Sequence, residues 1–377
     1  MTTAPTGGHA ALVEQLHERG LLDTAWRRVW LDVPRDRFIP DRVWRQEPTG
    51  CVPVTGADRL ALVHSDEPVV TQLDDGRPDG PGIATCSNSQ PSMVARVLQL
   101  LDVQDGHRVL EVGTGTGHLA ALLCARVGDR NVHTVEVDAE LVGQAASRLA
   151  TAGYEPCVAH ADGEWGVPSA APFDRVVVTC ALRHVPTALL EQLRPDGVLV
   201  APLDRDFWSG ALIRMDATGH GRFEGGASYM LMRSHRPASE PPAVDDSTVR
   251  HSVTGLVPHE LLTLGFALYA GARLPGVRMW HTRAGTGAKL WVQDLTGSAA
   301  AHVSGHDVWQ YGARALWREI EQVHAEYVEL GCPEGAEFGL TAAAGGHRVW
   351  LTRPARVIEP APWVSAAART DVHGDQS

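Results

Sequence analysis

The segment at residues 108–123, RVLEVGTGTGHLAALL, places three glycines at alternate positions directly after an apolar run. Gly113 allows a tight turn out of a strand, Gly115 lets a ligand approach the main chain, and Gly117 begins a helix whose free N–H groups face that ligand. A dinucleotide, a phosphate group and S-adenosylmethionine all suit such a turn. A P-loop is excluded because GxxxxGK[ST] is absent, and His118 stands where a dinucleotide loop normally has a small residue.

Acidic residues follow the glycines at two positions where a nucleoside could be bound. Glu136 comes 19 residues after Gly117, where its carboxylate could accept hydrogen bonds from both ribose hydroxyls. Asp162 and Gly163 follow a third, short predicted strand, PCVAHA at 156–161, and a carboxylate there could accept from an adenine amino group. The three signals together favour a nucleoside site over a plain strand-to-helix turn, but NAD and S-adenosylmethionine satisfy them equally.

Strands and helices that alternate along the chain would bring these residues to one edge of a sheet. Apolar runs predict buried strands at 108–112, 131–137, 173–181 and 197–203. Amphipathic helices are predicted at 91–103, 117–128 and 139–153. The expected fold is therefore α/β, a Rossmann-like doubly wound sheet rich in parallel strands, with a smaller α+β domain after it.

The composition of successive stretches predicts five parts: 1–80, an N-terminal helical cap segment; 81–235, the nucleoside-binding domain; 236–247, a linker rich in Pro, Ser and acids; 248–360, the α+β accessory domain; and 361–377, a disordered tail. Within the first part, RLALVHS at 59–65 suggests a strand. Within the fourth, residues 306–330 predict one helix with Trp309, Trp317 and Tyr327 on its apolar face.

Composition and charge narrow the class of protein. The chain of 377 residues has a formal net charge of −12 and no basic stripe, which disfavours nucleic acid as a partner. The six cysteines contain no CxxC pair, as expected of reduced thiols in a cytoplasmic protein. No secretory signal and no membrane span are predicted. His118, His184, His302 and His306 lack Cys or carboxylate partners at metal spacing, so no metal site is expected, and the oligomeric state is not indicated.

Several motifs in succession resemble those of class I S-adenosylmethionine methyltransferases: VLEVGTGTG, TVEVD, ADG and PFDRVVVTCA. Together with VPRDRFIP and NSQPSMVARVL, they make the chain similar to protein-L-isoaspartate O-methyltransferases. The resemblance implies a carboxyl O-methyltransferase that uses S-adenosylmethionine and releases S-adenosylhomocysteine. It assigns cofactor binding to Glu111, Gly113, Thr114, Gly115, Gly117, Glu136, Val137, Asp162, Gly163 and Thr179.

The chain departs from that family in two respects. The family's Thr-Ile-Ser-Gln-Pro reads Ser87-Asn88-Ser89-Gln90-Pro91, and a long C-terminal part follows the catalytic domain. The longer architecture, with HSDEPVVTQ, GRFEGG and WQYGARALW, resembles an actinobacterial branch associated with ribosomally made peptides such as graspetides, lanthipeptides and lasso peptides. That branch implies methylation of an aspartate in a constrained precursor peptide held by the C-terminal domain, giving an aspartimide, and the sequence leaves open whether this product is then hydrolysed to isoaspartate. The alternative is general repair of isoaspartyl residues in damaged proteins.

The expected chemistry needs no general base, because a carboxylate with a pKa near 4 is already ionised at neutral pH. Catalysis then depends on holding oxygen, methyl carbon and sulfur in line. The family resemblance assigns Ser89 to donate to the non-attacking oxygen, with Ser87 either assisting or contacting the cofactor. Alternatively, both serines cap the following helix. Glu111 either orients the cofactor's ammonium or braces the turn, and Thr179 either lines the site or packs in its strand.

Overall fold

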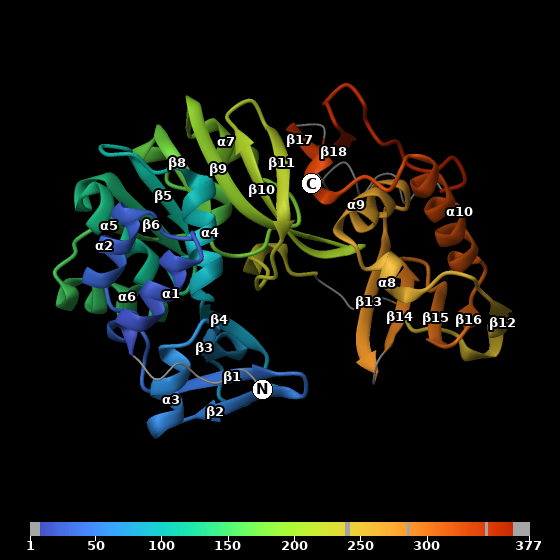
Figure 1. Cartoon of the computed structure of the whole chain (residues 1–377), viewed down its shortest axis with the longest axis horizontal. Helices are drawn as coiled ribbons and strands as arrows, with labels where there is room; N and C mark the ends of the chain where they lie inside the picture. The colour runs from blue at the N-terminus through green and yellow to red at the C-terminus, as the bar shows by residue number, and fades with distance from the viewer. Residues whose placement is uncertain (1–7, 238–241, 285–286, 344–345, 365–377) are drawn as a thin grey trace. The chain divides into compact units, whose positions relative to one another are not determined.

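The computed structural model describes residues 8–237, 242–284, 287–343 and 346–364 (Figure 1). The chain forms two compact units. The first holds the described residues up to Cys180, together with Ala188–Ala201 and Met232–Ser234. The second holds Ala181–Thr187, Pro202–Leu231 and the chain from His235 on.

The first unit begins with helices and a small antiparallel sheet. The helical elements are α1 (His9–Glu18), α2 (Thr24–Asp32), the single turn η1 (Arg35–Arg37) and α3 (Gly56–Val63). The sheet has the order β2-β1-β3-β4, from β1 (Val43–Glu47), β2 (Gly50–Val54), β3 (Val69–Leu73) and β4 (Ala84–Asn88). The strand expected at 59–65 is wrong, because α3 buries Leu62 and Val63 against Val43 and Ile39 instead.

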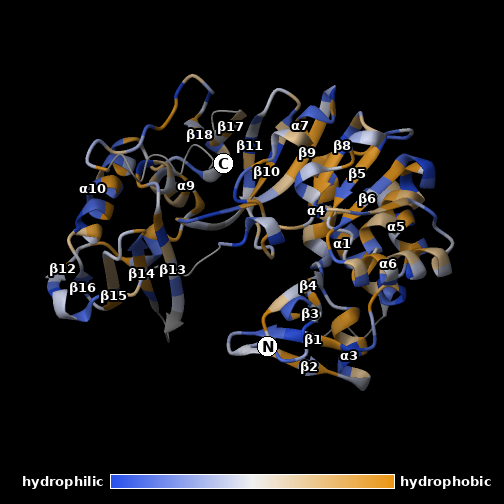
Figure 2. Cartoon of the chain, turned by 180° about the vertical axis from the view of Figure 1, so that it is seen from behind, coloured by the Kyte–Doolittle hydropathy of each residue, from blue (hydrophilic) through white to orange (hydrophobic). Residues whose placement is uncertain are grey.

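The second part of this unit is a parallel sheet with the order β9-β8-β5-β6-β7. Its strands are β5 (Val109–Val112), β6 (Val132–Glu136), β7 (Cys157–His160), β8 (Phe173–Val178) and β9 (Leu193–Arg205). Its helices are α4 (Pro91–Leu101), α5 (His118–Val127), α6 (Ala139–Ala152) and α7 (Thr187–Glu191). The central strands are mostly hydrophobic (Figure 2), as expected when both faces of a parallel sheet are buried. The predicted Rossmann-like class is confirmed.

The strand order reverses at β5, which has β6 on one side and β8 on the other. In open α/β sheets a ligand binds beyond the carboxyl ends of the strands at such a switch point. The glycine segment directly follows β5, so the topology places it where a ligand site is expected. None of the described helices is long and apolar enough to cross a membrane.

The second unit contains two sets of antiparallel strands. One has the order β18-β17-β11-β10, from β10 (Trp208–Asp216), β11 (His220–Gly226), β17 (Phe338–Ala343) and β18 (Gly346–Leu351). The other has the order β12-β16-β15-β14-β13, from β12 (Arg250–Val253), β13 (Val277–Ala284), β14 (Gly287–Asp294), β15 (Ala299–Ser304) and β16 (Asp307–Tyr311). Its helices are α8 (Pro258–Leu261), α9 (Leu264–Arg273) and α10 (Leu316–Glu329).

The division into units differs from the expected domain boundaries. Residues 202–231 belong to the second unit, because β11 pairs with β17 across a long sequence separation. Part of the predicted linker (238–241) and most of the predicted disordered tail (365–377) lie outside the described residues. Ala361, which that prediction includes in the tail, is buried, and its N–H donates to the Arg273 carbonyl at 2.8 Å.

The helix expected across 306–330 is split into a strand and a helix. Trp309 lies in β16 and is 39% exposed, whereas Trp317 and Tyr327 are buried on α10. Gly312, with φ +78°, separates the two elements. The prediction for Trp309 is therefore wrong, because a short apolar run is compatible with either period until its partners are known.

Candidate active site

The loop between β5 and α5 has a backbone that favours glycine. Gly113, Gly115 and Gly117 have φ values of +95°, +53° and +86°, in the region that side chains with a Cβ rarely adopt. A Cβ at Gly113 would lie 2.4 Å from Thr179 Oγ1, and one at Gly115 would lie 3.4 Å from Cys86 Sγ. The loop therefore requires glycine at 113 for both conformation and space.

Neighbouring strands fix this loop in place. The Gly113 N–H donates to the Val135 carbonyl at 2.8 Å, and Thr179 Oγ1 donates to the Gly113 carbonyl at 2.6 Å. The Gly115 N–H donates to Glu136 Oε2 at 3.0 Å. The Thr179 hydroxyl thus supports the main chain of the loop from β8, and Glu136 supports it from β6.

Glu136 keeps one acceptor position for a ligand. Its Oε1 accepts from the N–H groups of Val137 (3.0 Å) and Asp138 (3.1 Å), and its Oε2 accepts from Gly115. A carboxylate has about four lone-pair sites, so one on Oε2 has no donor among the residues that the structure describes and is left for a ribose hydroxyl. Two ribose hydrogen bonds, as the sequence suggested, would require a shared acceptor. The exposed side chain of Val137 follows directly, where an apolar surface can contact a nucleobase.

Asp162 and Gly163 lie at the end of the neighbouring strand β7. Asp162 Oδ1 accepts from the Glu164 N–H at 3.0 Å and from Ser234 Oγ at 3.3 Å. Among the residues that the structure describes, none donates to Oδ2, which is free to accept from an exocyclic amine. A Cβ at Gly163 would lie 2.4 Å from Val112 Cγ1, so this turn packs directly on the end of β5.

Glu111 lies beneath the loop. Its side chain is 1% exposed, and Oε2 accepts from Thr134 Oγ1 at 2.7 Å, which in turn pairs with Thr114 Oγ1 at 2.6 Å. Burial raises the pKa of Glu111 to about 8. Of the two roles that the sequence left open, this geometry favours bracing the loop, and it gives Thr114 the same supporting role.

The serine segment lies against the glycine loop. Cys86 and Asn88 are buried on one face of β4, where Cys86 approaches Gly115 and Asn88 Nδ2 donates to Thr116 Oγ1 at 2.9 Å. Ser87 and Ser89 are half-buried, and within the described ranges neither hydroxyl is hydrogen-bonded. The N-cap of α4 is Gln90 and has no side-chain cap, so the helix-capping alternative for the serines is wrong.

The cysteines near the site are neutral at physiological pH. Burial raises the pKa of Cys86 to about 11 and that of Cys180 to about 12. A protonated thiol is a poor nucleophile. Both residues are therefore packing groups in this structure.

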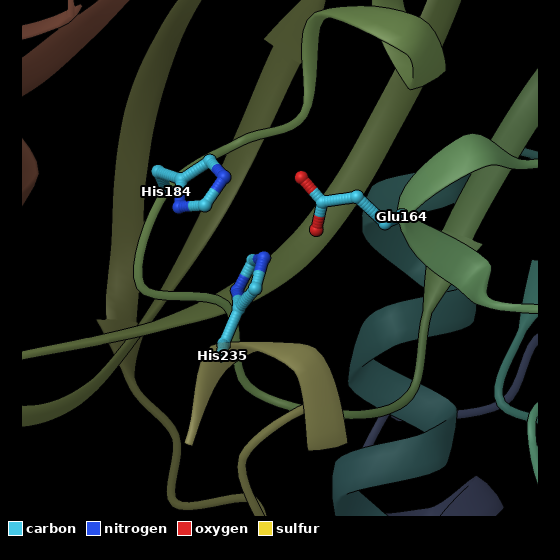
Figure 3. A group of neighbouring side chains, drawn as sticks. All are labelled: Glu164, His184 and His235. Atoms are coloured by element: carbon cyan, nitrogen blue, oxygen red, sulfur yellow. The ribbon is translucent and has the colours of Figure 1, made fainter. Parts of the chain in front are cut away.

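Two of the histidines considered above as metal ligands, His118 and His184, contact other rings. Burial lowers the pKa of His118 to about 3, and its ring packs between Trp30 and Phe38. In the second unit, His184 stacks on His235 with ring centroids 4.2 Å apart (Figure 3). His235 Nδ1 accepts the Arg183 N–H at 3.0 Å, which leaves the ring proton on Nε2.

A short segment after β11 contacts Asp138 and the candidate cofactor residue Asp162, and it has no signal in the sequence. Arg233 Nη2 donates to Asp138 Oδ2 at 2.7 Å, and Ser234 Oγ contacts Asp162 as described above. Arg233 lies 95 positions from Asp138 along the chain, and Ser234 lies 72 positions from Asp162. No local pattern marks them, since their role depends on the return of the chain to this sheet edge.

Comparisons with known proteins place this geometry in a family. Residues 79–227 match the sequence model of the protein-L-isoaspartate(D-aspartate) O-methyltransferase family. A protein-L-isoaspartate O-methyltransferase from Methanosarcina mazei is 34% identical over 212 residues, covering 55% of this chain and 75% of the relative. The corresponding protein of Methanothermobacter thermautotrophicus is 31% identical over 210 residues, covering 55% of this chain and 84% of the relative.

A solved structure of a protein-L-isoaspartate O-methyltransferase has the same fold over most of the chain. The TM-score is 0.55 at 17% identity, and the alignment covers 92% of this chain and 100% of the other. At this identity the likeness concerns the fold alone, whereas the sequence relatives carry the family assignment. The chain belongs to the protein-L-isoaspartate O-methyltransferase family and is an S-adenosylmethionine-dependent carboxyl O-methyltransferase.

Proposed function

We propose that the protein methylates the free carboxylate of an isoaspartyl residue in a peptide or protein. The observation that carries this proposal is the packing of the Ser87–Ser89 segment against the glycine loop, with both serine hydroxyls left without partners among the described residues. Substrate and methyl donor would then meet between two adjacent segments of one unit.

The residues at the sheet edge suit S-adenosylmethionine. The glycine loop admits close approach, Glu136 keeps an acceptor for a ribose hydroxyl, and Asp162 Oδ2 is open to an adenine amine. When bound, the cofactor supplies an electrophilic methyl group on its sulfonium. The chain's own contribution is to hold the acceptor carboxylate in line with that group.

Ser89 would orient the acceptor. Its O–H donates to one carboxylate oxygen, and the other oxygen is left to attack. No residue has to remove a proton, because the carboxylate is ionised at neutral pH. In the ester product, the backbone nitrogen of the following residue attacks the carbonyl carbon. A C–N bond forms, the C–O bond to methoxide breaks, and methoxide leaves as methanol with the amide proton, giving a succinimide.

A second candidate is a dedicated peptide substrate. Three tryptophans of the second unit stand in register across one face of a sheet: Trp280 pairs with Trp291, and Trp291 and Trp309 both pair with Ala301. Trp280 and Trp309 are 44% and 39% exposed. An exposed apolar tryptophan row of this kind suits the binding of a peptide. It therefore supports the second candidate, in which the second unit holds a ribosomally made precursor peptide whose aspartate is methylated and converted to an aspartimide. The length of the chain alone does not separate the two candidates, since a family structure aligns with 92% of it.

Transfer of labelled methyl groups would test the proposal. The substrates are a short isoaspartyl peptide and its normal aspartyl twin, with calorimetric binding of S-adenosylhomocysteine to show that the site is formed. Labelling of the isoaspartyl peptide alone is expected. If the protein binds S-adenosylhomocysteine but labels neither peptide, the general repair function is wrong and the dedicated substrate is favoured.

Removing the tryptophan row in the full chain discriminates further. Trp280 and Trp309 are partly exposed, although they contact the rings of Trp291 and His251. Trp280→Ala with Trp309→Ala should therefore lower the melting temperature without preventing folding, and should leave the labelling of a short isoaspartyl peptide unchanged. A reduced rate on a longer precursor peptide would support the second candidate. An unchanged rate on every peptide would remove the observation that favours it.

A further inference from the structure

Arg35 is a buried guanidinium that contacts uncharged acceptors. Its side chain is 1% exposed, and burial lowers its pKa to about 9, so it is still charged at neutral pH. Nε donates to Asn88 Oδ1 at 2.6 Å. The other nitrogens donate to the carbonyls of Val63, Ser65, Glu67, Asn88 and Ser89 at 2.9–3.2 Å. This one side chain therefore fixes the main chain at the carboxyl end of β4.

The side chain of Asn88 has both ends bound. Because a guanidinium can only donate, the atom facing Arg35 Nε must be the amide oxygen, and Nδ2 must face Thr116. Nδ2 donates to Thr116 Oγ1 at 2.9 Å, and both residues are buried. Neither end can exchange its partner for water, so the amide forms a fixed bridge from Arg35 to Thr116.

The Arg35–Asn88–Thr116 bridge joins the two halves of the active site. Thr116 lies between Gly115 and Gly117 in the glycine loop. On the other side, Arg35 Nη2 donates to the carbonyl of Ser89 at 3.1 Å. The acceptor-orienting serine and the cofactor loop are thus held at a set separation through one side chain.

We propose that Asn88 is a positioning residue for methyl transfer, which sets the distance between Ser89 and the glycine loop through its amide. The inference rests on the proposed role of Ser89. In-line transfer is sensitive to this distance, since a displacement of about 1 Å can cost about 100-fold in rate. Binding of the cofactor depends less on the bridge, because Thr179 and Glu136 hold the loop independently.

Four variants separate positioning from general stability. Asn88→Ala and Thr116→Val each break the bridge, whereas Thr116→Ser keeps the hydroxyl. The matched control is Asn131→Ala, which removes a side-chain amide donating to the Val127 carbonyl at 2.7 Å, away from the site. We expect kcat to fall by about 10-fold or more in the first two variants. Binding of S-adenosylhomocysteine should be close to wild type in those two variants. In Thr116→Ser and Asn131→Ala, kcat should also be close to wild type.

Two kinetic outcomes would overturn the inference. One is an unchanged kcat in both bridge-breaking variants at temperatures well below their melting points. The other is a loss of kcat matched by an equal loss of S-adenosylhomocysteine binding, which would mean that the bridge only maintains the loop. The combined Asn88→Ala/Thr116→Val variant should be no slower than either single variant, because both changes break one bridge.

Amide hydrogen exchange tests the bridge without any substrate. Exchange at residues 115–118 should be faster in Asn88→Ala and Thr116→Val and unchanged in Asn131→Ala. If the wild-type protein methylates no isoaspartyl peptide, the proposed function fails, but this measurement still decides whether Asn88 orders the loop. Exchange equal to wild type in both variants would overturn the inference whatever the activity.

Discussion

At the scale of single residues, the candidate site contains side chains with free hydrogen-bonding groups and side chains whose hydrogen bonds lead to the glycine loop. Ser87, Ser89 and Asp162 Oδ2 have free hydrogen-bonding capacity within the described residues, whereas Glu111, Thr114 and Thr179 are committed to the loop. The resemblance to the family grouped the last three with the cofactor-binding residues. Their contacts show that the same residue types can either bind a cofactor or support the backbone that a cofactor would touch.

Replacing Ser89 should reduce turnover without reducing cofactor binding. Ser89→Ala removes the hydroxyl expected to orient the acceptor carboxylate, so kcat should fall by about 10- to 100-fold. Steady-state kinetics with an isoaspartyl peptide would measure this, with calorimetry for S-adenosylhomocysteine. Ser147→Ala on the exposed face of α6 is the control. Full activity of Ser89→Ala would contradict the assigned role.

Glu111 should make stability fall as the pH rises. Burial raises its pKa from an ordinary value of 4.5 to about 8 in the folded protein. Between these values the unfolded chain has lost the proton and the folded protein retains it, so the free energy of unfolding decreases by up to about 1.4 kcal/mol per pH unit. The stabilising effect is complete below pH 4.5 and is lost as the pH passes 8.

Glu111→Gln isolates this effect, because glutamine keeps the shape and the oxygen that accepts from Thr134 but cannot ionise. Denaturant unfolding should be measured at pH 5 and pH 8. The free energy of unfolding should fall between these pH values more in the wild type than in the variant, so that the variant gains stability relative to the wild type at pH 8. Parallel pH profiles for the two proteins would show that Glu111 does not titrate in this way.

At the scale of elements, the loop between β5 and α5 should tolerate no side chain at its first glycine. Gly113→Ala would bring a Cβ to 2.4 Å from Thr179 Oγ1 and force alanine to a φ of +95°. We expect the free energy of unfolding to fall by about 1–3 kcal/mol. Binding of S-adenosylhomocysteine should weaken, which calorimetry would measure.

Two further variants check the cause of that loss. Thr179→Ala added to Gly113→Ala removes the close contact but not the backbone strain, so recovery should be partial. Gly143→Ala in α6 is the matched control, because its Cβ meets nothing within 4 Å and its φ is ordinary. It should stabilise the protein by about 0.5–1 kcal/mol. Equal behaviour at positions 113 and 143 would contradict the conformational argument.

The elements that sequence reasoning predicted correctly are those with a strong local pattern. The strands of the parallel sheet are short apolar runs bounded by turns, and the helices between them carry regular apolar faces. The segments at 59–65 and 306–311 were assigned to the wrong type, because a run of that length fits either period. Burial of Leu62 under the small sheet and pairing of Trp309 with Ala301 decided the outcome.

At the scale of the whole molecule, removing residues 240–377 should damage the second unit rather than cleanly remove a domain. β11 would lose β17, its partner from His220↔Thr341 to Arg222↔Gly339. Phe207 and Trp208 would lose α9, where Phe266 and Gly271 contact them. The truncated protein should therefore have a lower melting temperature and aggregate, as thermal unfolding and light scattering would show.

If the truncated protein aggregates, its activity cannot show which substrate the second unit binds. Loss of activity in the shortened chain would follow from exposed aromatic residues as readily as from a missing peptide-binding surface. A monodisperse, cooperatively unfolding truncated protein with full activity would contradict the prediction. The tryptophan-row variants of the intact chain avoid this difficulty, because they change exposed side chains.

The sequence by itself determined the class of fold, the glycine loop, the acids that follow it and the family to which the chain belongs. These features depend on residues close together along the chain, where spacing and apolar period are sufficient. Only the tertiary structure decided that Glu111 accepts from Thr134 beneath the loop, that β11 pairs with β17, and that Asn88 connects Arg35, 53 residues away, with Thr116, 28 residues away. Such contacts join distant parts of the chain, so they are set by how the elements pack together and leave no periodic pattern in the sequence.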